Sequence, residues 1–232
     1  MLLSTAYFPP LSWLALAARD MRVPQRATLC HSEPNCHSER SEESIIPSVV
    51  SLEACENYQK QSYRNRCYIL AGDGPQMLQV PVVHGNSWAI RDVLVDYSTP
   101  WILRTQRALD TAYETAAYYE YYRDDLFALL DARPATLWEL NLATINFLLN
   151  KTGIACKLEP TTEFIGPDLE ADDYRLTIHP KREDTVLSDL GLGLPYYQVF
   201  RDRMGGFTPK LSCLDLLFNE GPDSIVWLKK LP

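Results

Sequence analysis

Residues 64–83 have the sequence RNRCYILAGDGPQMLQVPVV, and this stretch decides the fold class. Its first part, Arg64 to Leu70, is predicted to be a strand. Gly72-Asp73-Gly74 is a strong turn signal, because glycine adopts the backbone angles that tight turns require. The chain then returns as a second strand from Met77 to Val83, and Pro81 marks that strand as an edge or a strand end. The stretch therefore predicts an antiparallel hairpin.

The residues before the hairpin predict a β-α-β unit. Leu2 to Tyr7 is apolar enough for a buried strand, and Pro9-Pro10 then turns the chain. Ser12 is placed to cap a helix that extends to about Arg19. Ser51 to Tyr58 is expected to be the next strand.

The residues after the hairpin add helices and further strands. Ala89 to Tyr97 alternates well enough for a strand, and Pro100 opens a helix that ends near Tyr113. Thr136-Leu137-Trp138-Glu139 is a capping box for a helix that stops near Gly153. Further elements are expected as a helix at Thr115–Asp131, strands at Ala155–Leu158, around Leu176–His179 and at Tyr196–Phe200, and a helix from Ser212 to Asn219. This order predicts an α/β or α+β fold with a mixed β-sheet and flanking helices, in a single domain over residues 1–232.

Composition limits the classes of function. The chain has 232 residues and a formal net charge of −8, so we expect no nucleic-acid partner. The apolar start, MLLSTAYFPPLSWLALAARD, resembles a secretory signal. It lacks a basic first segment, however, and Phe8-Pro9-Pro10 interrupts it, so a strand, turn and helix are favoured. No segment reaches the roughly 18 to 20 apolar residues of a membrane span. We expect a cytoplasmic protein with no membrane insertion.

Residues 24–50 differ from the rest of the chain. They are rich in Ser and Glu, contain three prolines, and show no sustained period. Within them, CHSEPNCHSERSEES (Cys30–Ser44) repeats Cys-His-Ser-Glu, and Cys30, His31, Cys36 and His37 are residue types that bind zinc. Structural zinc sites usually combine two separated ligand pairs. We therefore expect a disordered insertion loop rather than a metal site, and no cofactor. Cys55, Cys67, Cys156 and Cys213 are expected to be buried thiols.

The most unusual polar run is Asn57 to Arg66, NYQKQSYRNR. If this run is extended, its side chains alternate between two faces. Lys60, Ser62, Arg64 and Arg66 then share one face, and Gln61, Tyr63, Asn65 and Cys67 share the other. Three cations on one face suit a phosphate or carboxylate. The alternative is a solvated edge strand, where Lys and Arg discourage edge pairing.

Candidates for acid–base chemistry are few. His84 and His179 each follow a predicted strand and are general-base candidates if a carboxylate orients them. Ser212 and Asp215 either cap the last long helix or line a pocket at its N-terminus. The sequence has no Ser-His-Asp order, phosphate-binding glycine loop or HExxH motif.

Several motifs together resemble one family. They are Thr5–Ser12 (TAYFPPLS), Glu56–Cys67 (ENYQKQSYRNRC), Asp96–Trp101 (DYSTPW), Tyr197–Phe200 (YQVF) and Leu211–Asn219 (LSCLDLLFN). The chain resembles the WbqC-like family of bacterial proteins, in the form common in Bacteroidetes. The resemblance covers nearly the whole chain except residues 24–50. Joining Val23 to Ser51 would give an ordinary passage from helix to strand, and CHSERSEES itself resembles the translation of an interspersed DNA repeat.

The resemblance implies a function in surface-polysaccharide (O-antigen) biosynthesis. It suggests a transferase that moves an acyl or aminoacyl group on a nucleotide-activated amino sugar. The family's polar motif residues fall on Tyr7, Lys60, Gln61, Asn65, Arg66, Gln198, Ser212 and Asp215.

Two classes of function remain open. In the enzyme hypothesis, Lys60, Arg64 and Arg66 hold a diphosphate, Tyr7 and Tyr63 stack on base or sugar, and Asp215 or His84 is the base. The alternative is a non-catalytic binding or scaffold protein of envelope assembly, which predicts polar motifs spread over an open surface. If Lys60, Asn65, Arg66, Gln198 and Asp215 lie in one concave site, the enzyme hypothesis gains; if they are scattered, it fails.

Overall fold

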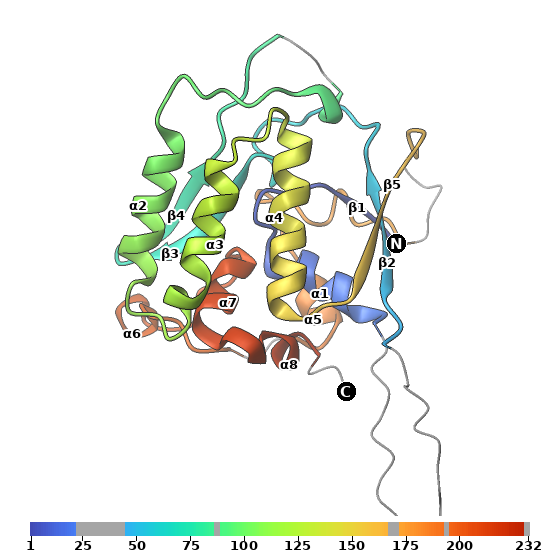
Figure 1. The fold of residues 1–232 in the computed structure, drawn as a ribbon. Coiled ribbons are helices and arrows are strands. Elements are labelled where there is room, and N and C mark those ends of the chain that lie inside the picture. Colours follow the sequence, from blue (N-terminus) through green and yellow to red (C-terminus); the bar gives the residue numbers. More distant parts are fainter. Residues whose placement is uncertain (22–44, 86–88, 167–171, 193–194, 230–232) are drawn as a thin grey trace, which may run out of the picture.

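A computed structural model describes residues 1–21, 45–85, 89–166, 172–192 and 195–229 (Figure 1). Its first sheet is parallel and contains β1 (Leu2–Ser4), β2 (Ser48–Glu53) and β5 (Cys156–Pro160), in the order β1-β2-β5. In the register, Leu3 is opposite Leu52. The central strand is buried on alternate positions, since Val50 and Leu52 are fully buried. The parallel strands lie side by side at one side of the molecule.

The second sheet is the predicted hairpin. It pairs β3 (Arg66–Ala71) with β4 (Gly74–Gln79) in antiparallel fashion, and Ala71 is opposite Gly74. Gly74 has a φ of 128°, which a residue with a side chain rarely adopts. The predicted α/β class is confirmed, although the parallel and antiparallel strands belong to two sheets rather than one mixed sheet.

Helices enclose the space between the two sheets. The longer helices are α1 (Leu11–Arg19), α2 (Trp101–Tyr113), α3 (Tyr119–Asp131), α4 (Leu137–Thr152) and α7 (Cys213–Glu220). Short turns of helix are η1 (Ile90–Asp92), α5 (Val186–Asp189), α6 (Arg201–Met204), η2 (Gly221–Asp223) and α8 (Ser224–Leu228). α1 packs against β2, α2 packs against β3, and α7 contacts both α3 and α4. The core between them is mainly aliphatic and includes large aromatic side chains, of which Tyr7, Trp13, Tyr113 and Phe218 are almost fully buried.

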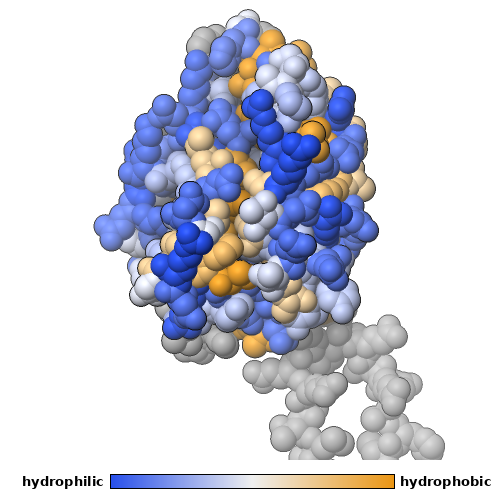
Figure 2. Space-filling model, turned by 90° about the vertical axis from the view of Figure 1, so that its left-hand side faces the viewer, coloured by the Kyte–Doolittle hydropathy of each residue, from blue (hydrophilic) through white to orange (hydrophobic). Residues whose placement is uncertain are grey.

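Figure 2 shows the face of the molecule that lies at the left of Figure 1. Hydrophilic side chains cover most of this face, and a band of apolar side chains crosses its middle. Exposed apolar side chains in this part of the fold include Met77 of β4 and Leu103 of α2, which are 43% and 45% exposed. Single exposed apolar residues of this kind are ordinary on a protein surface.

The capping box before α4 is formed as predicted. Thr136 Oγ1 accepts a hydrogen bond from the Glu139 amide at 3.1 Å, and Glu139 Oε2 accepts one from the Thr136 amide at 3.2 Å. At the other end, Gly153 has a φ of 71° and closes the helix in the left-handed conformation. The boundaries of this helix were therefore readable from local sequence.

Replacing Thr136 by alanine tests the cap. We expect the variant to lose about 1 kcal/mol of unfolding free energy, because the amide at the helix start loses its acceptor. Urea unfolding should show a lower midpoint with an unchanged slope. Thr136→Ser keeps the oxygen and is the control. An alanine variant as stable as wild type would mean that the cap contributes nothing.

Three predicted strands are wrong. Residues 89–97 form η1 and three isolated bridges, in which Ala89 pairs with Asn57, Leu94 with Thr136 and Val95 with Val82. Leu176–His179 forms turns, and Tyr196–Phe200 has no strand. The apolar residues of the last segment, Tyr196–Phe200, are explained by packing of side chains rather than by a strand. Tyr196 is buried by Phe207 and Trp227, whose ring centroids lie 5.1 and 5.4 Å from its own.

The last residues of the segment predicted as a disordered insertion loop, residues 24–50, form a strand. Ser48 to Val50 belong to β2, and Ser48 Oγ donates to the Ala17 carbonyl at 2.5 Å. Residues 24–44, with the candidate zinc ligands, lie outside the described residues. Four cysteines were expected to be buried. Cys67 and Cys213 are buried, whereas Cys55 and Cys156 are half-buried. No helix in the described part of the chain is long and apolar enough to span a membrane.

Candidate functional site

A cleft of about 720 Å³ opens beside the first residue of β3, and we call it the basic cleft. It brings together five residues that the sequence nominated: Lys60, Gln61, Asn65, Arg66 and His84. The other lining residues are Tyr58, Gln79, Pro81, Val82, Val83 and Asp96.

The start of the hairpin fixes one wall of the cleft. Arg66 is the first residue of β3 and lies opposite Gln79, the last residue of β4. Asn65 extends the pairing by one residue. Its carbonyl accepts from the Val80 amide at 2.8 Å, and its Nδ2 donates to the Val80 carbonyl at 3.1 Å. Arg66 and Asn65 are therefore held on the most regular part of this sheet.

The run from Asn57 to Asn65 is not extended, so the predicted alternation of its side chains is wrong. It forms successive turns, and Gln61 has a φ of 60°. Ser62 is buried and donates to the Gln59 carbonyl at 2.7 Å. Lys181 donates a hydrogen bond to Gln61 Oε1 from a distant segment. The turns bring Lys60 and Arg66 into the cleft with Gln61 and Asn65, which were expected on the opposite face.

Two polar atoms in the cleft wall are buried without a partner in the described part of the chain. Arg66 Nε is an unpaired donor, and Asn65 Oδ1 is an unpaired acceptor on a side chain only 2% exposed. Buried polar groups normally find a partner, because leaving one unpaired costs about 1 to 3 kcal/mol. No carboxylate of the described residues forms an ion pair with Lys60 or Arg66. The cleft therefore offers an anionic ligand a positive charge and an unpaired hydrogen-bond donor.

Tyr58 supplies the apolar surface of the same wall. It is half-buried, and burial raises the pKa of its hydroxyl, while the positive charges of Arg66 and Arg64 oppose that rise. The hydroxyl therefore stays protonated at neutral pH. An aromatic ring beside a guanidinium can stack on a planar ligand.

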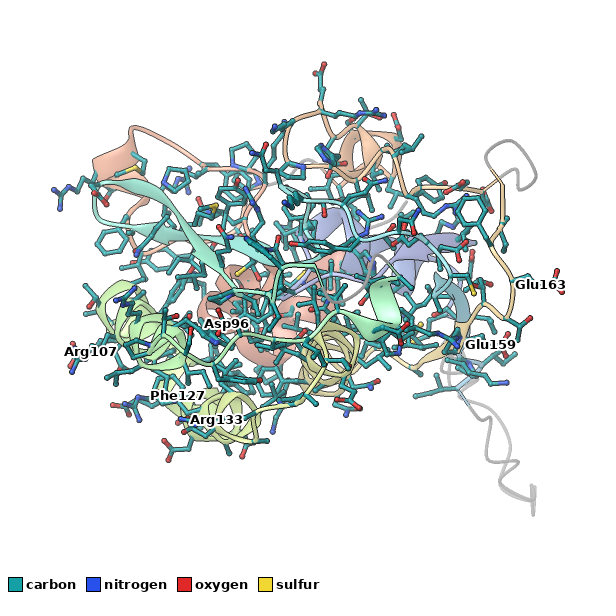
Figure 3. The ribbon with its side chains drawn as sticks, turned by 90° about the horizontal axis from the view of Figure 1, so that it is seen from above. Asp96, Arg107, Phe127, Arg133, Glu159 and Glu163 are labelled. Atoms are coloured by element: carbon teal, nitrogen blue, oxygen red, sulfur yellow. The ribbon has the colours of Figure 1, made fainter. Side chains whose placement is uncertain are left out.

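His84 and Asp96 face the cleft from two adjacent segments. Residues 81–83 run antiparallel to 94–96, since Val83 donates to the Leu94 carbonyl at 2.9 Å and Asp96 donates to the Pro81 carbonyl at 2.9 Å. Hydrogen bonds from Ser98 lower the pKa of the Asp96 carboxyl, and the charge of His84 contributes less. Asp96 lies toward the middle of the molecule when viewed from above (Figure 3). A histidine beside an ionised carboxylate is suited to general base catalysis.

Four other predicted binding residues lie outside the cleft. Arg64 is 4% exposed and donates from Nε to Glu56 Oε1 at 2.8 Å. Tyr63 is also buried, and its ring meets Tyr68 edge-on at 6.3 Å. Tyr7 is fully buried between Phe8 and Trp101. Ser212 caps α7, accepting from the Leu214 amide at 3.2 Å, which is the structural role left open from sequence.

Asp215 and Gln198 form a separate buried cluster. Asp215 accepts hydrogen bonds from Tyr113 Oη at 2.8 Å, Tyr196 Oη at 2.6 Å and Gln198 Nε2 at 2.9 Å. Both Asp215 and Gln198 are fully buried. Asp215 therefore joins α7 to α2 and to the segment at Tyr196, and it does not face the basic cleft. His84 remains the candidate base.

Three lining residues of the basic cleft were not predicted from the sequence: Tyr58, Gln79 and Asp96. Tyr58 and Asp96 stand inside the motifs that carry the family resemblance, but nothing local indicated their direction. The available signal for Asp96 was the Asp-Tyr-Ser turn, in which Asp96 Oδ1 accepts from the Ser98 amide at 2.8 Å. Within the described residues, no group of three His, Cys, Asp or Glu side chains is placed to hold a metal.

Comparison with known proteins identifies relatives. The model of the WbqC-like protein family matches residues 48–198 and begins where β2 begins. An uncharacterised protein of Mycobacterium tuberculosis, Rv1507c, is 28% identical over 194 residues, which cover 74% of this chain and 84% of that protein. No solved structure matches significantly. On the family match, which spans more than half of its length, the chain belongs to the WbqC-like protein family.

Proposed function

We propose that the chain binds a nucleotide-activated sugar through its phosphates in the basic cleft. The observation that carries this proposal is Arg66, whose buried Nε has no partner in the described structure and which forms no ion pair with a described carboxylate. Lys60 adds a second positive charge in the same cleft, on a chain whose net charge is −8. Arginine and lysine together suit a diphosphate, which offers several oxygen acceptors.

We further propose that the protein is a cytoplasmic transferase of surface-polysaccharide (O-antigen) biosynthesis. In this reaction His84, which lines the same cleft as Asp96, would accept a proton from the attacking hydroxyl or amine of an amino sugar. The acyl or aminoacyl group that the family resemblance suggests would come from an activated ester or thioester, whose alcohol or thiol would leave with the proton that His84 returns. The scaffold alternative predicts motif residues spread over an open surface. Of the five residues named for this test, Lys60, Asn65 and Arg66 share one cleft, which supports a small-molecule ligand, whereas Gln198 and Asp215 are buried outside it.

Thermal shift against a panel of nucleotide sugars tests the proposal. A ligand that binds the folded state raises the melting temperature. Arg66→Ala should weaken binding by about 10- to 100-fold, because a hydrogen bond to a charged group contributes roughly 1.5 to 3 kcal/mol. Added salt should weaken binding to the wild type.

Two further variants separate binding in the basic cleft from loss of surface charge and from catalysis. Arg107 projects outward from α2 (Figure 3), and Arg107→Ala removes the same charge without touching the cleft, so it should bind as wild type does. His84→Asn should keep binding and lose turnover. If no nucleotide sugar stabilises the protein, or if Arg66→Ala binds as well as Arg107→Ala, the proposed site is wrong.

A further inference from the structure

A second cavity, of about 270 Å³, lies on the other side of the 57–65 loop, and we call it the edge cavity. Its lining residues are Glu56, Asn57, Gln59, Arg64, Phe164, Asp173, Arg175 and Leu176, none of which lines the basic cleft. It adjoins the carboxyl edge of the parallel sheet seen in Figure 1, where β1 ends at Ser4 and β2 ends at Glu53. In open α/β sheets, ligands bind beyond the carboxyl ends of the strands.

The floor of the edge cavity consists of two fixed ion pairs. Arg64 donates to both carboxylate oxygens of Glu56, and Ser4 Oγ at the end of β1 also donates to Glu56 at 3.2 Å. Arg175 donates from Nη2 to Asp173 at 2.7 Å. These planar groups are held in place before any ligand arrives, which reduces the entropic cost of binding.

Both positive charges of this floor are compensated. The two guanidinium groups in the lining meet the carboxylates of Glu56 and Asp173, and Glu53 lies behind Arg175 at 3.0 Å. A phosphate or carboxylate would therefore find no uncompensated positive charge, in contrast to the basic cleft. This compensation favours a neutral polar ligand that exchanges hydrogen bonds with carboxylates and guanidinium groups.

The rim of the edge cavity adds an apolar platform and two amides. Phe164 and Leu176 are 57% and 52% exposed and lie together at this rim. The Arg175 guanidinium lies 5.6 Å from the centre of the Phe164 ring. Asn57 and Gln59 are exposed beside them. Their amide groups offer both donors and acceptors.

We propose that the edge cavity binds a neutral sugar. A pyranose presents an apolar C–H face, which packs on an aromatic ring such as Phe164, and hydroxyls that donate and accept in one plane. Asn57 and Gln59 would bind the outer hydroxyls, and Arg64 and Asp173 the inner ones. The role of this site as a second substrate position rests on the proposed function of the basic cleft, but binding itself does not.

Saturation-transfer NMR with free sugars tests the edge cavity directly. The probes are methyl glycosides and N-acetylglucosamine as neutral sugars, glucuronic acid as an anionic one, and inorganic pyrophosphate for the basic cleft. We expect neutral sugars to bind better than glucuronic acid. Phe164→Ala and Gln59→Ala should each weaken sugar binding by about tenfold, and both should leave pyrophosphate binding unchanged.

Matched variants separate the two sites. Tyr121 is an aromatic residue of α3 that is 78% exposed, so Tyr121→Ala controls for the loss of a surface ring. Arg66→Ala should keep sugar binding and lose pyrophosphate. Failure of pyrophosphate binding alone would overturn the proposed function and leave the sugar site standing. The sugar site itself is overturned if no neutral sugar binds, or if Arg66→Ala abolishes sugar binding while Phe164→Ala retains it.

Discussion

Replacing Arg64 by alanine is expected to lower the free energy of unfolding by about 3 to 5 kcal/mol, because the change leaves a buried carboxylate without its partner. Glu56 and Arg64 are 5% and 4% exposed, and Arg64 binds both oxygens of Glu56. Arg66→Ala, two residues along, should change stability by less than about 0.5 kcal/mol, since Arg66 forms no ion pair within the described structure. The two arginines of one motif thus have opposite expected phenotypes, one in stability and one in binding.

Urea unfolding of a mutant cycle measures the pair. The variants are Arg64→Leu, Glu56→Leu and the double replacement. Each single change should be strongly destabilising, whereas the double variant should recover much of the loss, because no lone charge is then buried. If the losses of unfolding free energy in the two single variants simply add in the double variant, the two side chains do not act as a pair. A stable Arg64→Leu protein would show that the buried pair is not formed.

The hairpin and the caps of α4 and α7 were predictable because their causes are local. A Gly-Asp-Gly turn, a Thr-x-x-Glu box and a terminal glycine each act within a few residues. The cap predicted at Ser12 is wrong, because α1 begins at Leu11 and Ser12 Oγ has no hydrogen-bond partner in the described part of the chain. The wrong strands have distant causes. Tyr97 looked like part of a strand face, but its ring stacks on Trp101 at 5.8 Å and its hydroxyl donates to the Pro134 carbonyl at 2.8 Å.

The candidate site was predictable to a similar extent. The charge pattern made Lys60, Arg64 and Arg66 candidates for an anion site within an acidic chain, with a solvated edge strand as the alternative. Their companions from outside the motif, Gln79 and Asp96, depend on β4 and on the pairing of 81–83 with 94–96, which no local pattern encodes. Arg64 was misassigned because its partner Glu56 is reached only when the loop turns back.

Replacing Asp215 by alanine is the second change expected to be severe, with a loss of at least about 3 kcal/mol in unfolding free energy. The hydroxyls of Tyr113 and Tyr196 and the Gln198 amide would lose a shared acceptor inside the core. The loss extends to the hairpin, because Tyr113 Oη accepts from the Leu70 amide of β3 at 3.2 Å. Chemical unfolding should show the lower stability, with Asn219→Ala, an alanine change one turn further along α7, as the milder comparison.

The dependence of this effect on pH follows from the burial of Asp215. Burial raises the pKa of its carboxyl above the ordinary 3.8, and the three hydrogen bonds oppose the rise. The folded state therefore binds the proton more tightly than the unfolded state does. The stability that this provides is full below pH 3.8 and is lost as the pH rises through the pKa of the folded state. Asp215→Asn resembles the protonated form and lacks that loss. The stability of wild type relative to Asp215→Asn should therefore fall as the pH rises, and a difference that grows with pH would mean that burial does not raise this pKa.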